Sequence, residues 1–176
     1  ISEVSFFIPV AICASLFPAI INSKKLSTKL YYNRLQNLYG LMVWLGVFFS
    51  MPFLLFGTEI ITLLFGPEYS IAGEVLKIHV CSYAFVFLGV AFSKYLIAQN
   101  YTKIDFYRTC IGALCNVSLN YFLILELGVI GAAYATVISQ FIANIAYDFF
   151  DKRLYQQLNM KFKTLLFPFK IIESLK

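Results

Sequence analysis

Five long stretches without a charged residue constrain this chain more than any other feature of its sequence. They cover residues 4–23, 35–58, 78–93, 109–125 and 127–147. A helix needs roughly 17–25 mainly apolar residues to cross a bilayer, and a lysine or arginine at its end can reach back to the interface. Because lipid offers no hydrogen-bond partner to an exposed backbone, and the alternation of a barrel strand is absent, these stretches predict helices.

The predicted fold is therefore all-α, a polytopic membrane bundle. We expect five membrane-spanning helices at about 2–22, 38–57, 72–97, 105–125 and 128–150, followed by a cytoplasmic tail at 151–176. The chain is 60% hydrophobic and 13% charged, with a mean hydropathy of +0.77. A soluble domain carries about 25% charged residues, so the composition excludes disorder and an ordinary water-soluble globule.

Basic and acidic residues fall on opposite sides of the predicted membrane spans. Of the 14 lysines and arginines, all except Lys77 fall in the first and third connections, near them, or in the tail. Glutamates dominate the opposite connections. The positive-inside rule places the basic side in the cytoplasm, so the first helix starts outside and the fifth ends inside. These bases are membrane anchors, and no nucleic acid is expected as a partner.

Two connections are predicted to carry structure of their own. Residues 27–38 mix apolar and polar side chains at helical spacing, which favours a helix lying along the cytoplasmic interface. Residues 57–70 predict an external turn, then a short helix at 59–65 that Gly66 and Pro67 end. The chain opens at Ile1 inside an apolar run, so we expect it to be a fragment.

Polar residues inside the predicted spans are the informative ones, because each is costly to place in lipid. The fifth helix carries a stripe four residues apart, consisting of Thr136, Gln140, Asn144 and Asp148. The fourth helix carries Asn116 and Asn120. These side chains either bond between helices and hold the bundle together, or line a hydrophilic passage.

Charges at the span ends have two interpretations each. Lys94 and Arg108 either anchor the cytoplasmic ends or contact an anionic headgroup entering from that side. Lys77 is the only base on the outer side, and its neighbour Glu74 offers it an i, i+3 pair. Glu3 opens the first helix and either titrates when desolvated or is a solvated end residue.

Signals for chemistry are weak. No nucleotide loop, zinc-protease or nucleophile motif occurs, and the single histidine, His79, is expected to be packed or solvated, so we expect no enzyme. The cysteines form no paired motif and predict buried reduced thiols: Cys13, Cys81, Cys110 and Cys115. No metal or cofactor is expected. Small residues predict close packing of the outer half of the fifth helix: Gly128, Gly131, Ala132 and Ala135.

Four pieces of the sequence resemble one family. They are SEVSFFIPV at 2–10 with SLFPAI at 15–20, LLFGPEY at 63–69, NVSLN at 116–120, and GVIGAAYAT at 128–136. Together and in this order they are similar to the C-terminal half of bacterial O-antigen flippases, polysaccharide transporters of the multidrug/oligosaccharidyl-lipid/polysaccharide exporter superfamily. The family's helices eight to twelve have the same alternation across the membrane as the charges predict here.

The resemblance implies a transporter of the bacterial cytoplasmic (inner) membrane that moves undecaprenyl-diphosphate-linked oligosaccharide to the outer leaflet by alternating access. It implies that Asn116, Asn120, Gln140 and Asn144 line a cavity or bundle contact. It also implies that Lys77, Lys94 or Arg108 meets the diphosphate and that Glu3 takes part in ion coupling. Implied partners are the bilayer, the missing N-terminal half and polysaccharide polymerase machinery. Alternatives are a peptidoglycan-precursor flippase or drug exporter of the same superfamily, a membrane-embedded glycan polymerase, or a structural assembly subunit.

Overall fold

The structure is a computed structural model that describes residues 6–166. Over this range the chain forms α-helices joined by short turns. They are α1 (Phe7–Ser23), α2 (Thr28–Phe65), α3 (Ser70–His79), α4 (Tyr83–Ala98), α5 (Thr102–Leu127), α6 (Val129–Asn144) and α7 (Tyr155–Leu166). A short 3₁₀ turn joins α3 to α4, so the two form one long segment that matches the third predicted span.

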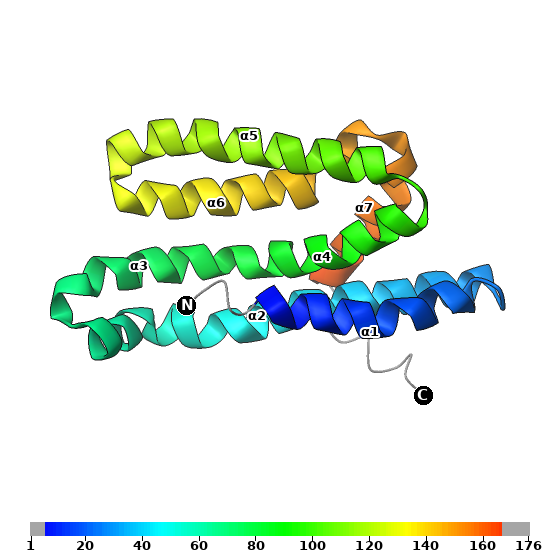
Figure 1. The fold of residues 1–176 in the computed structure, drawn as a ribbon, viewed down its shortest axis with the longest axis horizontal. Coiled ribbons are helices and arrows are strands. Elements are labelled where there is room, and N and C mark those ends of the chain that lie inside the picture. The colour runs from blue at the N-terminus through cyan, green and yellow to red at the C-terminus, as the bar shows by residue number, and fades with distance from the viewer. Residues whose placement is uncertain (1–5, 167–176) are drawn as a thin grey trace.

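The helices run nearly parallel to one long axis, as expected for a membrane bundle (Figure 1). α5 and α6 pair as an antiparallel hairpin on one side, α1 and α2 lie on the other, and the α3–α4 segment runs between them. The α1–α2 and α4–α5 connections lie at one end, and the α2–α3 and α5–α6 connections lie at the other. α7 crosses the first of these ends.

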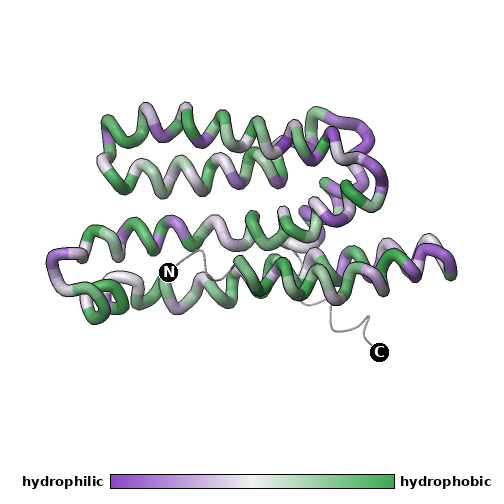
Figure 2. Tube along the Cα trace, in the orientation of Figure 1, coloured by the Kyte–Doolittle hydropathy of each residue, from purple (hydrophilic) through white to green (hydrophobic). Residues whose placement is uncertain are grey.

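Hydrophilic residues gather at the two ends of the bundle, while its length is mainly hydrophobic (Figure 2). Within residues 6–166, four helical segments are long and apolar enough to cross a membrane: Thr28–Phe65, Pro67–Ala98, Thr102–Leu127 and Val129–Phe150. α1 is apolar but shorter, at 17 residues, and the start of the span predicted at 2–22 lies outside the described residues. The protein is thus a multi-pass membrane protein.

The first connection differs from its prediction. Residues 28–38 do not form a separate interfacial helix, because they are the opening turns of α2. Tyr31, Leu35 and Leu38 are buried, so this apolar face packs against the bundle instead of lying in the interface. The predicted external helix at 59–65 is likewise part of α2, which is interrupted only by non-helical angles at Phe56 and ends at Gly66.

The end of the fifth span also differs. The predicted helix at 128–150 keeps α-helical geometry only as far as Asn144, after which Ile145 leaves the helical region and residues 146–150 form a 3₁₀ turn. Asp148 therefore does not continue the helical stripe of polar residues. It is nevertheless completely buried, because this turn folds back toward α7.

The core lies between α2 and α4. Tyr83 and Phe87 stack with ring centroids 5.8 Å apart, and Tyr39, Met42 and Leu88 are fully buried around them. Small residues permit this approach of the helices. The predicted close packing of α6 is confirmed at Gly131, because a side chain there would meet the Leu123 carbonyl of α5. It is wrong at Gly128, where a side chain would enter open space.

Candidate functional site

A half-open cavity of about 510 Å³ lies between the α3–α4 segment and the α5–α6 hairpin. Its walls combine apolar side chains with amides, hydroxyls, one imidazole and one guanidinium. They are formed by Phe6, His79, Ser82, Val86, Arg108, Thr109, Gly112, Ala113, Asn116, Thr136, Ser139, Gln140, Ala143 and Asn144. Such a wall can form hydrogen bonds with a polar ligand. Polar residues in a membrane interior usually mark a binding site or a pathway of this kind.

Some of the amide side chains bond between helices, and some line the cavity. Asn116 Nδ2 of α5 donates to Ser139 Oγ of α6 at 3.1 Å. Asn120 Nδ2 donates to Asn116 Oδ1 at 3.0 Å, one turn further along α5. Asn116, Gln140 and Asn144 border the cavity, whereas Asn120 does not.

Arg108 is the charged centre of the cavity wall. The residue is 5% exposed, so its guanidinium is buried and not solvated. Nη1 donates to Asn144 Oδ1 at 2.6 Å, and Nε donates to Asp105 Oδ1 at 2.9 Å. Ser93 Oγ of α4 donates to the second oxygen of Asp105 at 2.6 Å. α4, α5 and α6 therefore meet at this guanidinium.

A second buried ion pair lies beside the first. Lys161 of α7 donates from Nζ to Asp148 Oδ2 at 2.6 Å, and both side chains are fully inaccessible. The ammonium also lies 3.2 Å from the centroid of the Phe92 ring, a cation–π contact. Burial lowers the pKa of Lys161 to about 7, against the opposing attraction of Asp148. Lys161 is therefore not a solvated anchor of the tail.

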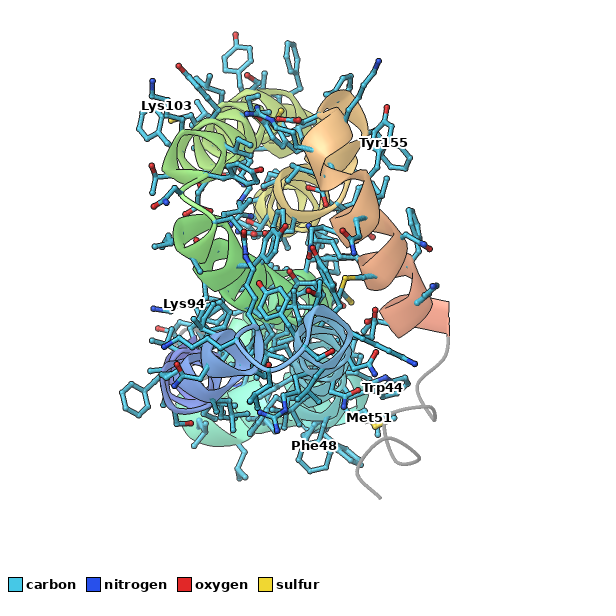
Figure 3. All side chains as sticks on the ribbon, turned by 90° about the vertical axis from the view of Figure 1, so that its right-hand side faces the viewer. Trp44, Phe48, Met51, Lys94, Lys103 and Tyr155 are labelled. Carbon is cyan, nitrogen blue, oxygen red and sulfur yellow. The ribbon has the colours of Figure 1, made fainter. Side chains whose placement is uncertain are left out.

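The other predicted charges lie apart from this cavity. Lys77 makes no ion pair with Glu74 within the described residues, and its side chain instead lies along Gly57 of α2. Lys94 is half-buried near Cys13 and lies at the edge of the bundle away from α7 (Figure 3). Glu3 falls outside the described residues.

The cysteines follow their prediction in part. All four are free. Cys13 is fully buried, as predicted, but Cys81 is exposed on the bundle surface, because its position on the 3₁₀ turn between α3 and α4 points it outward. Its Sγ donates to the Lys77 carbonyl one turn earlier.

Sequence reasoning missed several cavity residues and the attachment of α7. Ser82, Thr109 and Ser139 are single hydroxyls in apolar runs, and nothing local distinguishes those that face a cavity from those that face lipid. The inward position of Lys161 becomes clear only from the burial of α7. In α7 the buried positions include Gln157, Met160 and Thr164, so helical spacing places Lys161 on the same face.

The fold and the cavity together define a class: a helical membrane protein whose interior offers a polar, partly charged compartment, as transport proteins require. Comparison with known proteins gives the family. Residues 5–172 match the family described as "Lipid II flippase MurJ". The chain belongs to this family.

Two curated relatives extend the comparison. The chain is 30% identical over 118 residues to the "Capsular polysaccharide biosynthesis protein CapF" of Staphylococcus aureus, covering 65% of this chain and 30% of that protein. It is 26% identical over 143 residues to the "Probable low-salt glycan biosynthesis flippase Agl15" of Haloferax volcanii, covering 79% of this chain and 30% of that protein. The matches thus span about 30% of these relatives' length. No solved structure matches.

Proposed function

We propose that this protein is a flippase that moves undecaprenyl-diphosphate-linked oligosaccharide from the inner to the outer leaflet of the bacterial cytoplasmic membrane. The observation that carries the proposal is the half-open polar cavity between the apolar helices. Asn116, Gln140 and Asn144 supply both hydrogen-bond donors and acceptors, which suits sugar hydroxyls. The lipid tail of such a substrate remains in the bilayer while its head group occupies the cavity.

Within this proposal the charged end of the cavity serves the diphosphate. Arg108 lines the cavity and is the cation best placed to meet phosphate oxygens, since guanidinium binds them through a fork of donors. In the present structure Asp105 occupies part of that fork. A diphosphate therefore exchanges with Asp105 as it enters, and Asp105 restores the neutral pair after it leaves.

The charge pattern supports an orientation in the membrane, and the family resemblance supports a mode of action. The end that carries the α1–α2 connection, the α4–α5 connection and α7 faces the cytoplasm, supported by its lysines and arginines. Alternating access requires a second bundle facing this one, which the N-terminal half would supply, and polymerase machinery would receive the product. The protein carries out transport without covalent chemistry, and Glu3 remains a candidate for ion coupling.

Two candidate functions differ in the sugar that the substrate carries. The two relatives named for capsular polysaccharide and glycan biosynthesis favour an oligosaccharide repeat unit. The family match described by lipid II favours a peptidoglycan precursor as the second candidate. Both substrates carry a sugar on a lipid diphosphate, so the same cavity chemistry serves either one.

Apolar replacement of cavity amides tests the proposal. Asn116→Leu and Gln140→Leu should each lower the surface glycan by about tenfold at equal protein level, because loss of one or two hydrogen bonds to substrate costs about 1.4 kcal/mol. Surface glycan is measured by lectin binding to intact cells. The matched control is Val117→Leu, on the exposed face of α5, which should leave output unchanged. Normal output from both cavity variants would contradict the assigned roles.

A further inference from the structure

α7 is built into the end of the bundle as a structural part, not attached loosely to it. Seen along the axis, it runs from Tyr155 beside the α5–α6 hairpin toward α2 near Trp44 (Figure 3). Lys161, at the middle of its inner face, reaches between α4 and α6 and is fully buried. The helix thus connects both halves of the bundle across the end where Arg108 lies.

Asn144 joins Lys161 to the cavity wall. Its main-chain oxygen, the last of α6, accepts a hydrogen bond from Lys161 Nζ at 2.7 Å. Its side-chain oxygen accepts one from Arg108 at 2.6 Å, and its Nδ2 donates to Gln140 Oε1 at 2.9 Å. Gly89 of α4 has no side chain, and a Cβ there would collide with this amide. Asn144 therefore holds the side chains of Arg108 and Gln140, and Lys161 in turn holds Asn144.

Phe92 provides a second connection between the two cations. The Lys161 ammonium lies 3.2 Å from the centroid of this ring, and the Arg108 guanidinium carbon lies 5.0 Å from it. Removal of Lys161 therefore changes the surroundings of Arg108 through both Asn144 and Phe92.

Attachment of α7 does not require Lys161. Gln36 Nε2 of α2 donates to the Met160 carbonyl at 2.9 Å and to Thr164 Oγ1 at 2.6 Å. Tyr39 donates from its hydroxyl to Gln157 Oε1 at 2.7 Å. The desolvation cost of a buried ion pair offsets most of its electrostatic attraction, so apolar contacts would attach the helix more effectively. The Lys161 contact is better explained by what it orients.

We propose that Lys161 is a positioning residue for the transport site: it fixes Asn144, and through Asn144 the Arg108 side chain, at the α7 end of the cavity. This inference rests on the proposed function, in which Arg108 meets the diphosphate. It makes the helix after the last span part of the substrate site, although it touches no substrate itself.

The first test measures the position of Arg108 without any substrate. The variant is D148N/K161M in the full gene product, which removes both charges together and keeps α7 attached through α2. Phenylglyoxal modification of Arg108, located by peptide mass spectrometry, should rise by about fivefold, as expected when a hydrogen bond that holds a side chain is lost. K163M, on the exposed face of the same helix, should leave the modification unchanged. Unchanged Arg108 reactivity in D148N/K161M overturns the inference.

The second test measures affinity for undecaprenyl diphosphate in nanodiscs. R108Q should raise Kd by about tenfold and D148N/K161M by about fivefold, and combining them should add little beyond R108Q alone, because coupled sites are not additive. K161R should retain most of the affinity. If R108Q weakens binding while D148N/K161M does not, the positioning role is wrong and the proposed function stands. If R108Q binds normally although D148N/K161M exposes Arg108, the positioning is supported and the diphosphate role of Arg108 is wrong.

Discussion

The Lys161→Met variant is expected to lose about 3–5 kcal/mol of stability, because it leaves the Asp148 carboxylate buried without a counter-ion. Both side chains are fully inaccessible, and Asp148 Oδ1 has no hydrogen-bond partner among the described residues. The carboxylate therefore depends on Lys161 for compensation. Thermal and denaturant unfolding in detergent, followed by tryptophan fluorescence, measures the loss.

Two companion variants separate charge from volume in this experiment. Asp148→Asn combined with Lys161→Met should recover most of the lost stability, since replacement of a whole buried pair is often neutral. Lys163→Met removes a lysine from the exposed face of the same helix and should change stability by about 0.5 kcal/mol or less. If the single Lys161→Met variant is as stable as the wild type, Asp148 does not need Lys161 as its counter-ion.

Gly46→Leu is expected to prevent assembly of the bundle. A Cβ at this position would lie 2.8 Å from Ala84 Cα and 2.9 Å from the Tyr83 carbonyl carbon, both of them main-chain atoms of α4. Backbone cannot move aside as a flexible side chain does, so even alanine should cost about 1–3 kcal/mol, and leucine should separate α2 from α4. Fluorescence-detected size-exclusion chromatography of the detergent-extracted protein measures the folded fraction.

The control for this prediction adds the same side chain where there is room. Ala72 lies on the exposed surface of α3, so Ala72→Leu should give a normal elution profile. A normal, monodisperse profile for Gly46→Leu would mean that α2 and α4 do not approach as closely as the structure places them.

The sequence predicted the spans well because membrane insertion depends on local hydropathy. The segments at 72–97 and 105–125 agree with the α3–α4 segment and α5 to within three residues at either end. The errors occur where tertiary contacts decide. Residues 28–38 look interfacial by composition, yet they extend α2 because α7 and the bundle bury their apolar face.

The candidate site was predictable only in part. Asn116, Gln140 and Asn144 stood out because an amide in lipid is costly, whereas Ser139 did not, since a hydroxyl can bond to its own helix. Lys161 looked like an interfacial anchor because the positive-inside rule counts every base in a tail equally. Only the tertiary structure shows that Lys161 is the base buried against an acid, Asp148.

Movement of a lipid-linked oligosaccharide across the membrane is the activity that we propose for this protein. The most direct measurement depletes the protein in its native host and determines the amount and the leaflet of each undecaprenyl-diphosphate-linked sugar, using mass spectrometry and a membrane-impermeant oxidant. We predict accumulation of one such species in the inner leaflet, protected from the oxidant, with its mass separating a polysaccharide repeat unit from lipid II. Unchanged levels, or accumulation of single units accessible from outside, would contradict the claim.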